Sequence, residues 1–334
     1  MLHIQLRNRP FLTWKYDVPT ANAAGWVALC TAVITSSTYG GFAKNLSSAL
    51  SPLSLLFVSQ LLIAFFVLFS FGAVPTLKRL LVLRRQVILP LIAVGLTNGV
   101  IAPLLWFTGI QTTVAVNAAL FGRMDMIFMF VLAWIFIGEK ITRRHLISGG
   151  IIFLGILVVV FQGFQPVSIA IERGDLLILL ACFTFAVGSM IFRLYLHAVA
   201  AELVILCRAL TGICCFFIIS PFLPYTFGSE LQHFPLWLIP ALLGFCFIAQ
   251  FMNMFSFYQA IERLPIATIS LVTSFEIIGS ALFAHWYLHE PFMWYHIAGG
   301  LCILLGVLIL EILGTHATEE IKELHLVQER SHST

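Results

Sequence analysis

Residues Val114–Glu139, with the sequence VAVNAALFGRMDMIFMFVLAWIFIGE, form an apolar stretch that carries charge near its middle. About 20 apolar residues are enough for a helix to cross the ~30 Å hydrocarbon core of a bilayer. Arg123 and Asp125 therefore fall near the centre of a predicted membrane helix. A charged side chain at that depth costs about 2.5–3.5 kcal/mol on insertion scales and usually marks a functional site. This stretch predicts both a membrane protein and the place of its site.

A second copy of this stretch lies near the C-terminus, with Glu276 in the position of Asp125. When the sequence is aligned with itself so that these two acids match, other charged, histidine and glycine positions also match without a gap. This internal repeat predicts two similar halves. Because each half contains five predicted spans, an odd number, the halves must have opposite orientations in the membrane. Inverted repeats of this kind place binding sites near the bilayer midplane, where the halves meet. The further matched positions are Ile110 with Ile261, Leu120 with Leu271, Ala133 with Ala284, Glu139 with Glu290, His145 with His296, Gly149 with Gly300, and Leu154-Gly155 with Leu305-Gly306.

The composition supports an all-α polytopic membrane protein. The chain has 334 residues, of which 60% are hydrophobic and 10% charged, and its mean hydropathy is +1.01. Soluble domains carry about 25% charged residues. We predict ten transmembrane helices, which leave no room for a soluble catalytic domain. They cover residues 24–43, 52–72, 87–109, 114–137, 146–164, 175–196, 203–222, 235–259, 265–288 and 292–313.

These spans define two five-helix halves, 21–164 and 174–313, between an N-terminal segment 1–20 and a C-terminal tail 314–334. Most of the 18 Lys and Arg residues then fall on the side of the termini, and Lys44 and Arg173 on the other. Since basic residues are enriched on the cytoplasmic side, both termini are predicted to be cytoplasmic. Arg193 and Arg208 lie toward the cytoplasmic ends of their spans, and we interpret them as structural residues that snorkel to the interface.

We expect neither a cofactor nor a metal. All seven Cys residues fall inside predicted spans and behave there as small apolar residues. His285 and His289 have a spacing that can bind zinc, but no further ligands are arranged around them. The chain has no GxxxxGK[ST] motif, so ATP-driven pumping by this chain alone is not expected.

The three buried charges allow more than one arrangement. Arg123 and Asp125 are two residues apart, about 200° around a helix, and so do not share a face. We expect Arg123 to reach a carboxylate on another helix, with Glu276 as the candidate given by the repeat. These three groups either bind substrate or form a structural network. Alternatively, Glu276 is a proton-coupling residue, because burial would raise the pKa of its carboxyl group. Glu139 and Glu290, at the membrane ends, are expected to cap or orient loops.

Other candidate binding residues are polar or aromatic side chains at similar depth. An amide inside the membrane either lines a cavity or bonds a neighbouring helix, and an aromatic ring can stack on a planar or cationic ligand. The glycine- and hydroxyl-rich end of the first span, Ser36–Gly41, favours a face turned toward a cavity. The candidates besides the three charged residues are Tyr39, Asn98, Trp106, Phe121, Asn253, Tyr258 and Phe275.

Short motifs in a fixed order cover nearly the whole chain and resemble those of the EamA-type carriers of the drug/metabolite transporter superfamily. This resemblance implies a 5+5 inverted-repeat fold, cytoplasmic termini, and a central cavity lined mainly by the first, third, fourth, sixth, eighth and ninth helices. The motifs are Tyr39-Gly40-Gly41-Phe42-Ala43-Lys44 with Ser51-Pro52, Gly138-Glu139, Gly174-Asp175-Leu176-Leu177, Arg193, Arg208, Glu262-Arg263-Leu264-Pro265 and Leu288-His289-Glu290.

The sequence departs from that pattern where Ser59-Gln60 replaces a common arginine and where Met126 and Ile277 replace common prolines. Arg123 and Asp125 add charge that many members lack, so the departures bear on the substrate and not on the fold.

We therefore expect a secondary active transporter or exchanger of a small polar metabolite, in the inner membrane of a bacterium. One base, two acids and aromatic rings suit a zwitterionic or cationic amino-acid-like solute such as S-adenosylmethionine, with its carboxylate on Arg123. Alternatives are an exporter of amino acids or amphipathic drugs, an intramembrane enzyme that uses Asp125 and Glu276, and a passive channel. The expected partners are the lipid bilayer and a proton or counter-substrate, not nucleic acid, and the chain is expected to be a monomer or homodimer.

Overall fold

The computed structural model describes residues 23–83, 85–137, 143–161, 172–196, 199–222, 227–261, 263–264, 272–273, 275–291 and 293–309. The predicted terminal segments 1–20 and 314–334 lie outside the described residues, as does Glu139.

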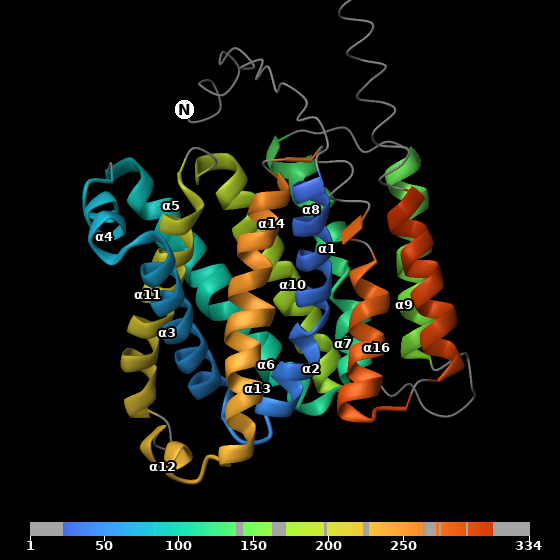
Figure 1. Ribbon diagram of the computed structural model, residues 1–334. Helices are drawn as coiled ribbons and strands as arrows, with labels where there is room; N and C mark the ends of the chain where they lie inside the picture. Colours follow the sequence, from blue (N-terminus) through green and yellow to red (C-terminus); the bar gives the residue numbers. More distant parts are fainter. Residues whose placement is uncertain are drawn as a thin grey trace, which may run out of the picture.

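The described residues are helices and their connections, with no strand among them (Figure 1). Several helices run on through short π-helical segments, labelled η1, η2 and η5. The first half contains α1 (Ala23–Ser37), α2 (Tyr39–Leu46), α3 (Pro52–Phe71), α4 (Ala73–Leu81), α5 (Arg85–Leu96), η1 (Thr97–Ile101), α6 (Ala102–Thr112), α7 (Ala115–Phe121), α8 (Met124–Ile137) and α9 (Arg143–Val160). The second contains α10 (Arg173–Ile191), η2 (Phe192–Leu196), α11 (Ala201–Ile219), α12 (Phe227–Gln232), α13 (Ile239–Gly244), η5 (Phe245–Met252), α14 (Asn253–Ile261), α16 (Glu276–Leu288) and a helix Trp294–Ile309.

Five helical stretches in the described part of the chain are long and apolar enough to cross a membrane, and three more are apolar but shorter. The chain is therefore a helical membrane protein with several spans. The long stretches are Pro52–Phe71, Arg85–Thr112, Arg173–Leu196, Glu202–Phe222 and Leu236–Phe257, and the shorter ones are Ile127–Phe136, Leu146–Val159 and Trp294–Ile309.

The first predicted span is not one continuous helix, because it is interrupted at Thr38 between α1 and α2. Its hydroxyl groups bond the preceding turn: Thr38 Oγ1 donates to the carbonyl of Thr35 at 2.7 Å, and Ser37 Oγ to that of Val33 at 2.7 Å. Such back-bonding competes with the helical ladder and bends helices.

The prediction of a continuous helix over 114–137 is also wrong, since Gly122 and Arg123 form a turn between α7 and α8. The Arg123 amide donates to the carbonyl of Leu120 at 3.3 Å, one residue closer than in an α-helix. A helix-interior glycine weakens the helix by about 1 kcal/mol relative to alanine. The turn therefore forms without the proline that the family pattern has nearby.

The two halves of the chain interlock instead of packing as separate bundles. α1 packs against α14 and α16, α3 against α11, α6 against α10, and α7 against α16. In Figure 1 the first-half helices α1, α2 and α7 lie beside α16 of the second half. Segments from both halves therefore surround the centre of the molecule.

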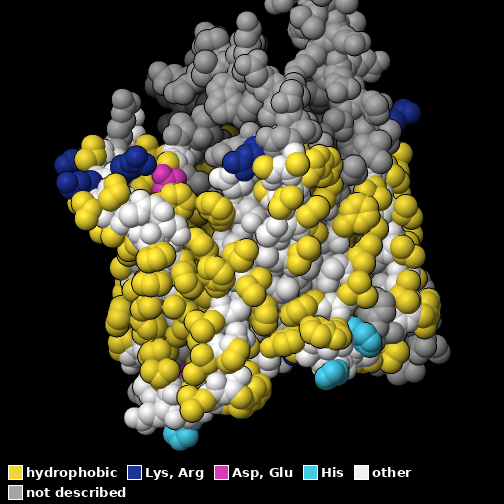
Figure 2. All heavy atoms as spheres, in the orientation of Figure 1, with side chains coloured by type: hydrophobic (Ala, Val, Ile, Leu, Met, Phe, Trp, Pro, Cys, Tyr) yellow, Lys and Arg dark blue, Asp and Glu magenta, His cyan; other side chains and the backbone are white. Residues whose placement is uncertain are grey.

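The outer surface is that of a protein in lipid (Figure 2). Large apolar side chains face outward, and Phe69 and Trp286 are 79% and 74% exposed. Apolar patches of this extent are rare on soluble monomers. In this view the Lys and Arg side chains gather at one end of the apolar belt and the His side chains at the other.

The fifth and tenth predicted spans pack against each other within one chain. A Cβ added to Gly155 of α9 would lie 2.7 Å from the carbonyl oxygen of Gly299 and 2.8 Å from Cγ1 of Ile303. Without a side chain at Gly155, the two helix backbones approach closely, as small residues allow in membranes. Of the matched glycines of the repeat, Gly155 and Gly306 both lie at this internal helix contact, whereas a Cβ on Gly149 would meet nothing within 4 Å.

We predict that Gly155→Ala lowers the thermal midpoint of the detergent-solubilised protein, by the equivalent of about 1–3 kcal/mol, because the added methyl overpacks this contact. Gly150→Ala on the same helix is the matched control, since a Cβ there meets nothing within 4 Å. That control should be neutral or stabilising by up to about 1 kcal/mol. Equal midpoints for the two variants would contradict the packing.

Candidate functional site

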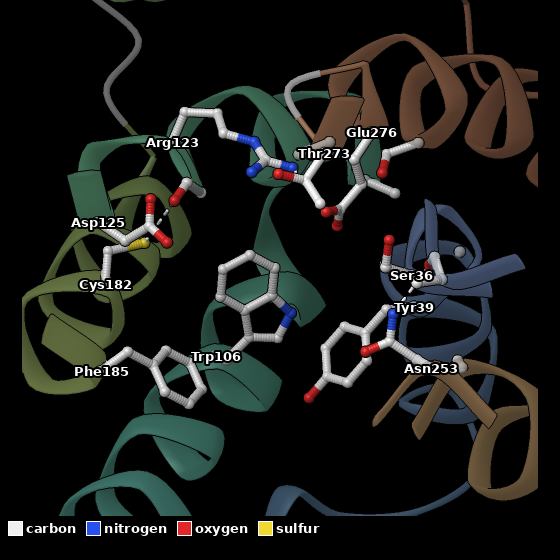
Figure 3. A pocket seen from close by; sticks show the side chains of 18 of the residues that line it. Ser36, Tyr39, Trp106, Arg123, Asp125, Cys182, Phe185, Asn253, Thr273 and Glu276 are labelled. Carbon is white, nitrogen blue, oxygen red and sulfur yellow. Dashed lines mark hydrogen bonds and ion pairs between the residues drawn. The ribbon is translucent and has the colours of Figure 1, made fainter. Parts of the chain in front are cut away.

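A cavity of about 440 Å³ lies at the centre of the molecule (Figure 3). Its walls come from α1, α2, α6, the α7–α8 turn, α10, η5, α14 and α16. These segments belong to the first, third, fourth, sixth, eighth and ninth predicted spans, as the resemblance implied. Ser36, Gly40 and Gly41 are among the lining residues, which confirms the cavity-facing interpretation of the first span.

One wall of the cavity is closed by an ion pair between the two halves. Nη2 of Arg123 lies 2.9 Å from Oε2 of Glu276, and their side chains are 14% and 26% exposed. Figure 3 shows the two side chains pointing toward each other. This pair confirms the predicted reach of Arg123 to a carboxylate on another helix.

Asp125 is the third charged group of the lining and lies near Cys182 of α10. Asp125 and Glu276 occupy the first turns of α8 and α16. The N-terminal end of a helix carries a partial positive charge and favours a carboxylate there. With one base and two acids, the charged side chains of this lining leave a net negative charge.

Aromatic rings form another part of the wall. The rings of Tyr39 and Trp106 meet edge to face with centroids 6.2 Å apart, and Tyr39 also contacts Phe245 at 5.1 Å. Phe185 lines the cavity from α10. The buried indole Nε1 of Trp106 has no hydrogen-bond partner among the described residues. The wall therefore combines ring faces with one N–H donor that a ligand could use.

Asn253 links the second half to the first through a hydrogen bond at the edge of the cavity. Its Nδ2 donates to the carbonyl of Ala32 in α1 at 2.9 Å. Asn253 follows the π-helical segment η5, whose wider turns are frequent at functional sites. Its side chain is thus both a lining group and a link between α14 and α1.

The structure brings together six of the ten candidate residues: Tyr39, Trp106, Arg123, Asp125, Asn253 and Glu276 all line the cavity. Phe121 does not, because it is fully buried in the hydrophobic core. Phe275, the neighbour of Glu276, is 45% exposed and is not among the residues that line the cavity. Asn98 is packed against Gly188 and Arg208 instead of lining the cavity, and the side chain of Tyr258 lies outside the described part.

Sequence reasoning missed several lining residues because they carry little polar signal. Cys182 and Phe185 of α10 resemble the other apolar positions of that span, and Thr273 and Ser280 are isolated hydroxyls around Glu276. A helical spacing of three to four residues from Glu276 places Thr273 and Ser280 on its face. This spacing is the sequence signal that could have identified these two lining residues.

Charged side chains also fix the junction between α6 and α7, which leads into the Arg123 turn. Nζ of Lys44 donates to the carbonyls of Ile110 at 2.7 Å and Thr113 at 2.6 Å. The carboxylate of Glu290 accepts the amides of Ala115 at 2.9 Å and Val116 at 3.1 Å. A cation thus satisfies the C-terminal carbonyls of one helix, and an anion the N-terminal amides of the next. The prediction that Glu290 caps a helix is confirmed.

An apolar body of interlocked helices around an internal cavity with charged lining residues is typical of an integral membrane protein. The chain belongs to the EamA-like transporter family, whose model matches residues 23–161 and 172–312. It is therefore an integral membrane protein of a transporter family.

Individual relatives agree with this assignment. An uncharacterised transporter of Methanothermobacter thermautotrophicus is 25% identical over 231 residues, which cover 68% of this chain but only 66% of that relative. An uncharacterised transporter of Synechocystis sp. is 23% identical over 272 residues, 79% of this chain and 77% of the relative. A solved crystal structure of a protein superposes with a TM-score of 0.56 at 16% identity, covering 89% of this chain and 99% of that one, which shows a shared fold.

We predict that Glu290→Gln destabilises the protein by about 1–3 kcal/mol, because the neutral amide leaves buried N–H groups of α7 poorly satisfied. Glu202→Gln is the control with the same chemical change. Glu202 pairs with Arg79 at 3.4 Å, but the Arg79 side chain is 67% exposed, so its loss should cost below about 1 kcal/mol. The measurement is the denaturation midpoint of purified protein, and an equal shift for both variants would refute the capping.

Proposed function

We propose that the protein is a secondary active transporter or exchanger that moves a small polar metabolite by alternating access. The observation that carries the proposal is the central cavity with Asp125 and the Arg123–Glu276 pair, built from both halves of the chain. The best candidate substrate is a zwitterionic or cationic amino-acid-like solute such as S-adenosylmethionine.

The proposed architecture is ten transmembrane helices in two inverted five-helix repeats, 21–164 and 174–313, with cytoplasmic ends in a bacterial inner membrane. Its support is the twofold match of the family model along the chain. The matched acids Asp125 and Glu276 also lie at the starts of matched helices, α8 and α16. Such broken helices at a repeat interface are where transporters of this type bind substrate.

The chemistry of the cavity suits a cation next to a planar group. The excess carboxylate of the lining attracts an ammonium or sulfonium, and Trp106, Tyr39 and Phe185 offer ring faces for a cationic or planar group such as adenine. The geometry does not support a substrate carboxylate on Arg123, because Glu276 already bonds this guanidinium at 2.9 Å.

An exporter of amino acids or amphipathic drugs is the second candidate, favoured by the aromatic part of the lining. An intramembrane enzyme is disfavoured, since Asp125 and Glu276 extend from different walls and Arg123 bonds Glu276 (Figure 3), so they do not form a carboxyl pair. Coupling to a proton or a counter-substrate, in a monomer or homodimer, completes the proposal.

Uptake of labelled S-adenosylmethionine into proteoliposomes, with and without a proton gradient, tests this function. We expect Asp125→Asn and Glu276→Gln to reduce uptake at low substrate by about tenfold or more, since a charge-assisted contact contributes about 1.5–3 kcal/mol. Glu202→Gln, at a pair outside the cavity, should transport normally. Full transport by both cavity variants would refute the proposed roles of these acids.

A further inference from the structure

A second, smaller compartment of about 200 Å³ adjoins the central cavity. The two share four lining residues, Tyr39, Phe185, Ala249 and Asn253. They are thus neighbouring parts of one internal space, with these shared residues at their border.

The two compartments differ in the ionisable residues that line them. The ionisable side chains of the central cavity include Arg123, Asp125 and Glu276, one more acid than base. The second compartment contains Arg208, and no Asp or Glu is among the described residues that line it. An interior of low dielectric strengthens the effect of each such charge on a ligand.

The second compartment contains two amide N–H donors that are unbonded or weakly bonded. Nε2 of Gln250 is buried and has no hydrogen-bond partner among the described residues. Nε2 of Gln60 lies 3.5 Å from the carbonyl of Gly99, at the outer limit of a hydrogen bond. A buried donor without a partner costs about 1–3 kcal/mol, so an acceptor that enters this space recovers that cost.

Arg208 is held in place by the backbone of the opposite helix. Its Nη2 donates to the carbonyl of Asn98 at 2.9 Å, within the π-helical segment η1. Gln250 also lies in a π-helical segment, η5. The carbonyl of Asn98 orients the guanidinium, so the second compartment combines a positioned arginine with the unsatisfied Nε2 donor of Gln250.

We propose that this second compartment binds the carboxylate of the substrate, through Arg208 and Gln250, while the cationic group of the same molecule lies in the central cavity against Asp125. The inference rests on the proposed transport function for its substrate and deepens it: the substrate is an elongated zwitterion whose two charges are far enough apart to reach both compartments. Arg208 is then a substrate-binding residue instead of a snorkelling structural one.

Charge-selective thiol labelling tests the compartment without any transport assay. The variants are Gln250→Cys in the second compartment and Ser280→Cys in the central cavity. Each is treated with an anionic sulfonate-bearing and a cationic trimethylammonium-bearing methanethiosulfonate, and labelling of that position is followed by peptide mass spectrometry. The anionic reagent should react about fivefold or more faster at position 250, relative to its rate with a free thiol, and the cationic reagent faster at position 280.

Arg208→Gln in the Gln250→Cys background should remove the anionic preference. The labelling preferences at positions 250 and 280 are compared in protein that keeps Arg208. This comparison therefore tests the proposal even if the Arg208→Gln variant does not fold. Equal or cationic preference at position 250, or no labelling there by either reagent, would overturn the proposal.

A matched pair of solutes separates this inference from the transport function. Proteoliposomes with Arg208→Gln should lose about tenfold in apparent affinity for S-adenosylmethionine but not for its decarboxylated analogue. Equal loss for both solutes would contradict the carboxylate assignment while leaving transport in place. Failure of the unaltered protein to transport either solute would refute the proposed substrate, and the labelling result would still decide the charge of the compartment.

Discussion

The ion pair between Arg123 and Glu276 is the interaction on which the central site depends. Glu276 has its matched position at Asp125, whereas Arg123 has no charged counterpart in the second half, where Ser274 stands. An arginine placed alone in an apolar body would be strongly unfavourable, and a carboxylate on another helix removes much of that cost. The pair therefore connects the α7–α8 turn to the start of α16. It also leaves the cavity with one acid in excess, which sets the charge of the ligand that it suits.

Much of the fold was predictable because it follows from patterns that act along the chain. The apolar stretches predicted the helices, and the matched acids, histidines and glycines predicted two similar halves. Gly155 shows the limit, because its contact with the helix that carries Gly299 is known only from the packing. The break at Thr38 was not predicted, since hydroxyl back-bonding is compatible with both straight and bent helices. The π-helical segments also have no simple sequence pattern.

The candidate site was predictable where charge marks it and less so elsewhere. The reach of Arg123 to Glu276 followed from helical angle and repeat, both of which are geometric. Phe121 and Phe275 do not line the cavity, although they stand next to or near Arg123 and Glu276 in the sequence. Adjacent and next-nearest residues of a helix face different directions. Arg208 was interpreted as a snorkelling residue from its position along the span, yet it lines an internal compartment. Depth in the membrane is visible in a sequence, whereas the direction of a side chain depends on how helices are rotated against each other.

The most direct test of the account is a double-mutant cycle on the Arg123–Glu276 pair, read as the free energy of unfolding of the protein in detergent. Arg123→Gln and Glu276→Gln should each lose about 3 kcal/mol, because each leaves a charge of the pair without its partner. The double variant should lose less than the sum of the two by about 1–3 kcal/mol. Additive losses would show that the two side chains do not interact and would contradict the central claim.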